Sequence, residues 1–185
     1  MWWRQTNGML GSSVDVVLSL VGTYGAVVLL GIFVLEGALV GKLIPTRTLF
    51  VAAVLAVGVD AVAFLPMVAA AVVGATIGQL LLFVAVRRFD ADPAALSVVP
   101  GDGDRFDAPS RWLDRWGLPA VAVSNALPGT RGWLAVPTAG SSVSAPRFVA
   151  ASFAGSTVYA SALLAVAFGV SGAFDAVAGA VLVLI

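Results

Sequence analysis

Two arginines in otherwise apolar stretches are the residues of this sequence whose surroundings best suit binding chemistry. Arg47 lies in LIPTRTLF and Arg131 in NALPGTRGWLAVPTAG, and each follows a proline by two or three residues. Proline suits the first turn of a helix, where unpaired backbone N–H groups and the helix dipole favour an anion. A guanidinium there adds a planar fork that matches phosphate or carboxylate. The repeated pattern predicts two half-helices that open on one anion-binding site.

Neutral donors stand next to both arginines. The hydroxyl groups of Thr46, Thr48 and Thr130 can donate to an anion, and Gly129 lets the backbone approach it closely. We therefore expect these residues to bind substrate together with the arginines. The residues alone leave an alternative open, in which both arginines lie at a membrane interface and contact lipid headgroups.

Glu36 is the single glutamate of the chain and stands near the end of a long apolar stretch. An ionisable group at membrane depth is costly unless it is paired or hydrated, so it is a candidate functional residue. We expect it to balance the charge of the two arginines or to exchange a proton. The alternative is that its side chain extends to a nearby interface.

The absence of histidine and cysteine from all 185 residues excludes several kinds of chemistry. Zinc centres, haem ligation, thiol or Ser–His catalysis and phosphohistidine intermediates depend on these side chains. Five of the ten acidic residues lie in a loop rich in proline and glycine, namely Asp90, Asp92, Asp102, Asp104 and Asp107. A magnesium-dependent phosphatase needs acids on a fixed frame instead. We expect no metal, no cofactor and no catalytic residue, and therefore a chain that is not an enzyme. The net charge of zero argues against a nucleic-acid partner.

The elements that position these residues are predicted to lie in a membrane. Hydrophobic residues make up 60% of the chain, charged residues only 11%, and the mean hydropathy is +1.03. Residues 16–35, 61–86 and 148–174 carry no charge, and about 20 apolar residues suffice to cross a bilayer. The sequence predicts an all-α integral membrane protein with about four membrane-spanning helices.

The two halves of the chain show the same order of apolar and broken segments. The first half has a span over about 14–40, a short apolar piece over 49–59 and a long span over 61–86. The second half has an apolar piece over 118–126, the break around the second arginine and a long span over 148–168. Pieces too short to cross, in matching places of two halves, indicate the two re-entrant half-helices of an inverted repeat.

This order predicts one membrane domain, with a first repeat over about 14–88, a linker over about 89–116 and a second repeat over about 117–185. Within the second repeat, Pro137 should kink or end its helix and mark the turn back. The stretch 174–185 is short for a full crossing and is left undecided. The structural breaks of the re-entrant elements are assigned to four residues: Pro45, Pro128, Pro137 and Gly140.

The only long polar stretch, residues 87–115, contains five of the nine arginines. Because positively charged loops stay on the cytoplasmic side, we expect this loop and the N-terminus in the cytoplasm of a multi-pass plasma-membrane protein. The end of the stretch, DAPSRWLDRW, has apolar and charged side chains on opposite faces of a helix. It predicts a short amphipathic helix on the membrane surface.

These motifs together resemble the DedA family, also called the SNARE-associated or VTT-domain family. Members carry a glutamate at the end of the first span, matched here by Glu36, and a P-G-[DE] element, matched by IPTRTLF. Their second motif, G-R-[FY]-x-P-x-x-R…P-x-x-G, is matched by NALPGTRGWLAVPTAG, and RFVAASFAGSTVYA matches the span that follows. The chain departs from the family twice. Arg47 replaces the acid of the first motif, and Asn125 replaces the first arginine of the second.

The resemblance implies a function and a site. Members of the family move lipids between leaflets, so the chain is expected to translocate undecaprenyl phosphate, dolichyl phosphate or a phospholipid. The arginines would hold the phosphate near the midplane, with Asn125 counted among the substrate-binding residues and Glu36 as the charge-balancing or proton-coupling group. The expected partners are membrane lipids, and a second copy of the chain is a further candidate partner. Two alternatives stay open: a proton- or ion-coupled transporter of small solutes with the same fold, and a membrane-embedded lipid phosphatase.

Overall fold

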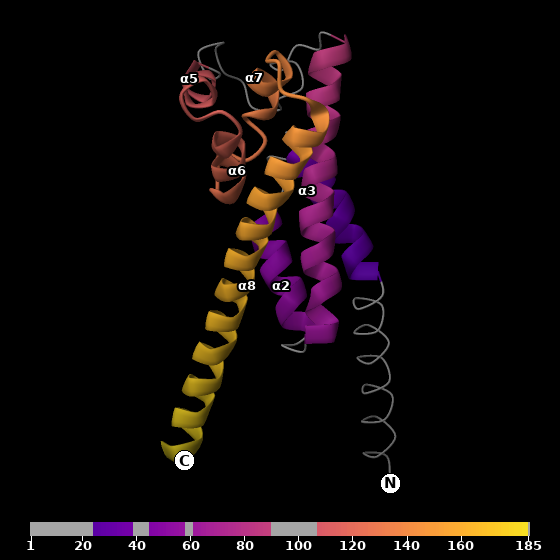
Figure 1. Ribbon diagram of the computed structural model, residues 1–185. Coiled ribbons are helices and arrows are strands. Elements are labelled where there is room, and N and C mark those ends of the chain that lie inside the picture. Colours follow the sequence, from indigo (N-terminus) through magenta and orange to yellow (C-terminus); the bar gives the residue numbers. More distant parts are fainter. Residues whose placement is uncertain (1–23, 39–44, 58–60, 90–106, 185) are drawn as a thin grey trace.

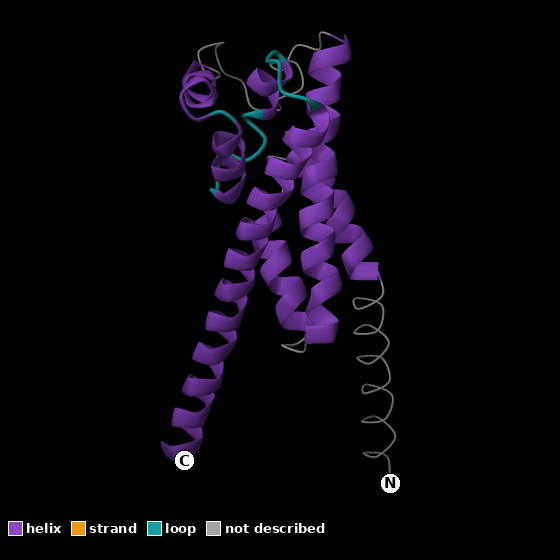
Figure 2. Ribbon diagram, viewed as in Figure 1, coloured by secondary structure: helices purple, strands orange, loops and turns teal. Residues whose placement is uncertain are grey.

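The computed structural model describes residues 24–38, 45–57, 61–89 and 107–184. Every regular element in these residues is a helix, so the predicted all-α class is confirmed for them (Figures 1 and 2). In chain order, the helices are the first helix Tyr24–Gly37, α2 Thr46–Val57, α3 Ala61–Phe89, α5 Asp107–Trp116, α6 Leu118–Ala126, α7 Ala135–Ala139 and α8 Ala145–Leu184.

Two helices, α3 and α8, are long and apolar enough to cross a membrane. Their apolar segments run over Phe64–Phe89 and Ala145–Phe174, with mean hydropathies of 2.2 and 1.7. Large apolar side chains on α8 are exposed, Val158 by 59% and Phe174 by 71%, and such a surface suits hydrocarbon better than water. The sequence predicted about four spans, and the described residues contain these two.

The end of the chain continues α8 instead of forming a separate crossing. α8 has 40 residues, which corresponds to about 60 Å, or about twice the hydrocarbon thickness of a bilayer. The stretch 174–185, undecided from the sequence, is part of this helix as far as Leu184. Figure 1 shows the C-terminal part of α8 extending beyond the lower end of α3.

Aromatic contacts set the antiparallel pairing of α3 and α8. Phe83 stacks on Phe148 with ring centroids 4.6 Å apart, and Phe64 meets Phe168 edge to face at 5.4 Å. The two pairs are separated by almost the same number of residues along each helix. The helices therefore run antiparallel in one register, and residues one turn from each pair lie at corresponding levels. Figure 1 shows the two helices moving apart toward the lower end of α3.

The first helix packs on α3 through glycines and ends halfway along it. A Cβ atom at Gly74 would collide with the carbonyl oxygen of Leu30, and one at Gly78 with that of Val34. The backbones therefore touch, and the order of the contacts shows that the two helices run parallel. The predicted span over 14–40 thus ends at Gly37, beside the middle of α3, and its residues 14–23 lie outside the described part.

α2 runs back from this level along the lower half of α3 (Figure 1). It begins directly after Pro45, as the sequence predicted for a helix opened by proline. Phe50 meets Phe33 of the first helix edge to face at 6.1 Å, and Val54 and Met67 are buried nearby. These residues form the lower core of the molecule.

α6 and the turn that follows it lie in the upper half of the molecule. The structure of this turn differs from the one predicted from the sequence. α6 begins with Pro119 in its first turn and ends at Ala126. Leu127 is extended (φ −97°, ψ 136°), because a residue before proline avoids the helical conformation. The prediction that Pro128 opens a half-helix with Arg131 at its start is wrong: the chain forms turns from there until α7 begins.

α7 is the short return of this upper element. Pro137 lies inside it, and the helix ends two residues later with Gly140 as its C-terminal cap. The chain then turns and enters α8. The assignment of Pro137 and Gly140 to the break of a re-entrant element stays a prediction. The side chains of α6, α7, α3 and α8 bury an upper core around the Phe83–Phe148 stack, with Val121 and Leu134.

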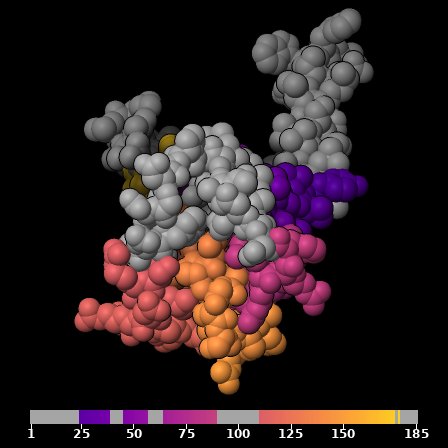
Figure 3. Space-filling model, turned by 90° about the horizontal axis from the view of Figure 1, so that it is seen from above, coloured from indigo at the N-terminus to yellow at the C-terminus, as the bar shows by residue number. Residues whose placement is uncertain are grey.

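α5 is the amphipathic helix predicted from DAPSRWLDRW. It buries Leu113 in the upper core and exposes Trp112 by 45% and Trp116 by 61%. Figure 3 looks down on this face, where orange residues that include the start of α8 lie between the salmon residues of α5 and the magenta end of α3. Arg87 of α3 donates from Nη1 to the carbonyl of Val143 at 2.7 Å, which fastens α3 to the segment before α8. The rest of the predicted linker, residues 90–106, lies outside the described part.

Candidate functional site

A layer of polar side chains separates the lower core from the upper core. It lies at the level of Gln79, about 15 Å along α3 from Phe89, and so near the middle of the membrane-capable segment Phe64–Phe89. This polar cluster comprises Glu36, Arg47, Gln79, Asn125, Arg131, Ser152, Ser156 and Tyr159.

Arg131 is the buried cation of the polar cluster. Its Nη1 atom lies 3.6 Å from Oε2 of Glu36, and the two side chains are 6% and 17% exposed. Its guanidinium also lies 4.0 Å from the ring centroid of Tyr159 and 5.7 Å from that of Phe33. An unpaired charge at this depth is strongly disfavoured, so the carboxylate and the two rings stabilise the guanidinium together.

Arg47 reaches the same tyrosine from the opposite element. It occupies the first turn of α2 and is exposed, and its Nε atom donates to the hydroxyl of Tyr159 at 3.0 Å. The structure thus brings Arg47 and Arg131 to one aromatic side chain, with Glu36 paired to Arg131. Because α2 comes from the lower half and the turn of Arg131 from the upper half (Figure 1), the two elements meet at the polar cluster.

Asn125 connects the turn of Arg131 to α3. Its Nδ2 donates to Oε1 of Gln79 at 2.8 Å, and its Oδ1 accepts from the backbone N–H of Gly132 at 3.2 Å. Gly132 has φ 77°, a conformation that costs glycine little. Asn125, expected to bind substrate, therefore uses both ends of its amide to hold the turn in place.

The other residues predicted to bind substrate lie apart from one another. Thr130 donates to the carbonyl of Ser124 at 2.9 Å and Ser124 donates back to that of Thr130 at 2.6 Å, so this hydroxyl closes the turn. Gly129 is exposed with φ 94°. Thr48 is exposed on α2, whereas Thr46 is buried at its start. The structure does not bring Thr48, Gly129 or Thr130 into the polar cluster.

Sequence reasoning missed four members of the polar cluster. Tyr159 was noted only as part of a motif, and Gln79, Ser152 and Ser156 were not considered as site residues. One signal in the sequence could have found three of them. Ser152, Ser156 and Tyr159 are spaced four and three residues apart, and this spacing places polar groups on one face of an apolar helix.

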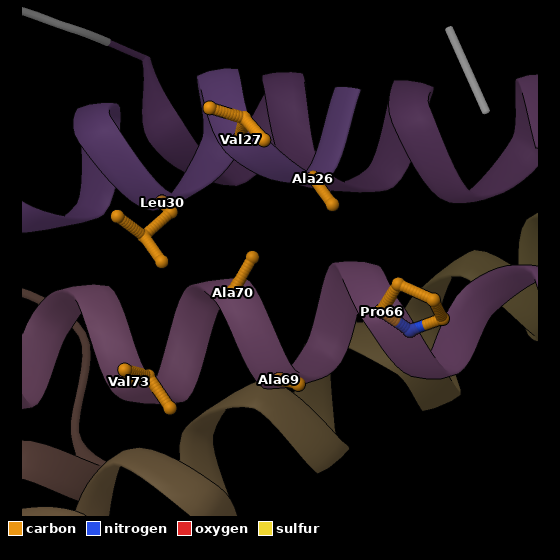
Figure 4. A pocket seen from close by; sticks show the side chains of 7 residues that line it. All are labelled: Ala26, Val27, Leu30, Pro66, Ala69, Ala70 and Val73. Carbon is orange, nitrogen blue, oxygen red and sulfur yellow. The ribbon is translucent and has the colours of Figure 1, made fainter. Parts of the chain in front are cut away.

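A separate apolar groove lies between the first helix and α3 in the lower half (Figure 4). It has a volume of about 240 Å³ and runs between Ala26, Val27 and Leu30 on one side and Ala69 and Ala70 on the other. No charged residue lines it, so it suits hydrocarbon. The glycine contact of the two helices closes its end towards the polar cluster, and the groove does not reach the buried ion pair.

Among the described residues, no three acidic side chains gather in a way that could hold a metal ion.

A family model described as the VTT domain matches residues 44–171, and this segment contains the whole polar cluster except Glu36. No curated protein and no solved structure matches the chain.

Proposed function

The chain belongs to the VTT-domain family, and from this premise we propose that it is a membrane lipid translocase. Its cargo would be a polyprenyl phosphate (undecaprenyl or dolichyl phosphate) or a phospholipid, whose headgroup moves between leaflets. Proteins of the family are generally membrane proteins, and α3 and α8 have the length and composition to cross a bilayer. One observation carries the proposal: the buried Glu36–Arg131 ion pair lies beside Arg47 at the middle of these helices.

The order of the helices supports an inverted repeat with two re-entrant elements. The first helix and α2 would form one element and α6 and α7 the other, entering from opposite faces (Figure 1). Each is followed by a long helix that it touches at a glycine: Val34 meets Gly78 of α3, and Ala122 meets Gly155 of α8. Irregular backbone at membrane depth is tolerated where protein buries it, and Arg131 and Gly132 of the turn are buried.

The distribution of arginines supports an orientation. Arg87 and Arg88 end α3, and Arg111 and Arg115 lie on α5 at the same upper face. We place this face in the cytoplasm of a multi-pass plasma-membrane protein, because positively charged loops are retained there. The N-terminus, expected in the cytoplasm, lies outside the described residues.

In this proposal Arg47 and Arg131 act in sequence on the phosphate. Arg47 is exposed and can meet a headgroup that arrives from the side, while the apolar tail stays in the bilayer. Arg131 is buried and paired with Glu36. For the phosphate to bind, it must displace this carboxylate from the guanidinium, or Glu36 must take up a proton. Without ligand, Glu36 balances the charge of Arg131, and the release of the anion restores that pair.

A transporter of small solutes is the second candidate, and the enclosure of Arg131 favours it. The residue is only 7% exposed and lies between two apolar cores, a setting that suits a small anion. An enzyme, such as a lipid phosphatase, is the least favoured reading. The sequence offers neither histidine nor cysteine for it, and we propose that the chain is not an enzyme.

Proteoliposomes can separate these candidates. Wild-type protein should speed the transfer of a polyprenyl phosphate from the outer to the inner leaflet, whereas the Arg131→Ala variant should not. Uptake of inorganic phosphate into the same vesicles tests the second candidate, and its release from the lipid tests the phosphatase. Lipid transfer no faster than in protein-free vesicles, with uptake of inorganic phosphate, would replace the proposed function by the second candidate.

A further inference from the structure

Three side chains buried between α3 and α8 have polar atoms that lack a partner. Gln79 is 0% exposed, Ser152 0% and Ser156 1%. Among the described residues, Nε2 of Gln79 and Oγ of both serines have no hydrogen-bond partner. Buried polar groups are nearly always satisfied, so three such atoms in one region indicate that a ligand completes them.

The serines differ from the threonines on the same helices. Thr76 of α3 donates to the carbonyl of Val72 at 2.7 Å, and Thr157 of α8 donates to that of Phe153 at 2.9 Å. This bond to the preceding turn is the ordinary use of a hydroxyl in an apolar helix. Ser152 and Ser156 have no such bond, so their hydroxyl groups remain available to another molecule.

The three side chains lie within about one helical turn along α3 and α8, at the level of the turn that carries Arg131. Gln79 and Ser152 each lie one turn beyond the Phe83–Phe148 stack, which sets the register of α3 and α8. Gly155 faces Asn125, the partner of Gln79, since a Cβ atom there would lie 2.7 Å from that of Asn125. Ser156 is followed one turn later by Tyr159, whose ring covers Arg131.

The available atoms are mainly donors, which specifies the ligand. Nε2 of Gln79 can only donate, because the amide oxygen already accepts from Asn125. Nε and Nη1 of Arg131 also have no hydrogen-bond partner in the described part of the chain. A cation would need oxygen ligands, whereas an oxyanion accepts from every one of these groups.

We propose that Gln79, Ser152 and Ser156 form, with the N–H groups of Arg131, the subsite that binds the oxygens of a phosphate group. The inference deepens the proposed function and rests on its phosphate ligand. The neutral hydrogen-bond donors to the phosphate would then be residues of the two long helices α3 and α8, and not the threonines next to the arginines. Phosphate is the chemistry that a lipid headgroup and a free phosphate ion share.

The test compares variants of the purified chain in neutral detergent, with inorganic phosphate and dodecyl phosphate as probes in calorimetry. Ser152→Ala/Ser156→Ala removes only the two hydroxyl groups and should weaken the binding of the preferred probe by about tenfold or more. Gln79→Glu keeps the acceptor for Asn125 but replaces the donor by a negative oxygen, and should abolish binding. Thr76→Val removes a hydroxyl that its own helix already uses and should bind as wild type.

Thermal unfolding shows whether the serine variant still folds. Its midpoint should be equal to or higher than that of the wild type, because an unsatisfied buried hydroxyl is lost. Weaker binding at unchanged stability supports the subsite. Wild-type affinity of the double variant for both probes, or equal losses in the double variant and Thr76→Val, would overturn it.

The two probes and a transport assay distinguish a failure of the phosphate subsite from a failure of the proposed function. Binding of dodecyl phosphate alone assigns the subsite to a lipid headgroup, and equal binding of inorganic phosphate assigns it to the free ion. If the double variant loses binding but the wild type moves no polyprenyl phosphate in phosphatidylcholine vesicles, the subsite stands and lipid translocation fails. If the wild type moves the lipid and the double variant binds and moves it equally well, translocation stands and the subsite is wrong.

Discussion

Arg131 is held by three chemically different neighbours, which contact its edge and its faces. Glu36 provides the opposite charge at 3.6 Å, and the rings of Tyr159 and Phe33 lie at 4.0 and 5.7 Å. Despite these contacts, Nε and Nη1 make no hydrogen bond within the described residues. The guanidinium is therefore stabilised as a charge while its donors stay available, as an anion-binding residue requires.

The first prediction concerns the shape of this cation. Arg131→Lys keeps the charge but loses the planar fork and the stacking on Tyr159, so lipid transfer should fall about tenfold or more. The measurement is the initial rate of polyprenyl phosphate transfer in proteoliposomes. Arg47→Lys, at the exposed position, serves as the comparison and should be milder. Wild-type rates in both variants would leave the arginines as interfacial anchors.

The second prediction concerns the carboxylate that balances Arg131. Glu36→Gln leaves a buried cation unpaired, so the ligand-free protein should lose about 3 to 5 kcal/mol of stability. Phosphate should restore part of that loss and should bind more tightly than to the wild type, because the competing carboxylate is gone. Thermal unfolding with and without dodecyl phosphate measures both effects. Weaker phosphate binding in this variant contradicts the charge-balancing role, and a lost dependence of transfer on the pH gradient would assign a proton to Glu36.

At the scale of elements, glycines decide where the short helices dock. Gly78 lets the first helix reach α3, and Gly155 lets α6 reach α8, in each case at the level where the short helix ends. Because the backbones touch, the last residues of both short helices project into the polar cluster. Glu36 and Asn125 hold equivalent places in this respect, one residue before the last residue of their helices.

The third prediction tests this docking with two glycines of α8. A Cβ at Gly155 would collide with the backbone of Ala122, so Gly155→Ala should cost about 1 to 3 kcal/mol and displace the turn of Arg131. Gly172 has open space around it, and Gly172→Ala should be neutral or slightly stabilising, since alanine favours a helix. Thermal unfolding in detergent compares the two. Equal midpoints would show that α6 can move away from α8 at no cost.

At the scale of the whole molecule, two apolar cores enclose the polar cluster. The Phe83–Phe148 stack lies in the upper core, and the Phe33–Phe50 contact lies in the lower core. α3 and α8 run through both cores, whereas the short helices stay in one half each (Figure 1). In the proposed translocation, the passage of a headgroup through this layer would require one of the two cores to open.

The fourth prediction concerns the orientation of the molecule. The chain has no cysteine, and Arg111 is exposed on α5. The thiol of an Arg111→Cys variant can therefore be labelled without background from other residues. A thiol reagent that cannot cross membranes should leave this cysteine unlabelled in intact cells and should label it after permeabilisation. Labelling in intact cells would place the arginine-rich face outside and reverse the proposed orientation.

The sequence by itself was sufficient for the features that depend on composition and local pattern. Uncharged stretches of bilayer length predicted apolar helices, Pro45 predicted the start of α2, and the amphipathic pattern predicted α5. The motifs around Glu36, Arg47 and Arg131 also predicted the family, because they reside in short contiguous segments. These properties follow from hydrophobicity and backbone sterics, which act between near neighbours in the chain.

Only the tertiary structure decided what each polar residue contacts. Pro128 ends α6 instead of opening a helix, because the residue before it becomes extended and the turn is held by Asn125. Thr130 closes that turn, while Ser152 and Ser156 of α8 are buried with hydroxyl groups that have no hydrogen-bond partner among the described residues. A hydroxyl or amide can bind its own backbone, a neighbour or a ligand, and its choice depends on the partner that packing brings near. That partner lies many residues away in the chain, so no local pattern encodes it.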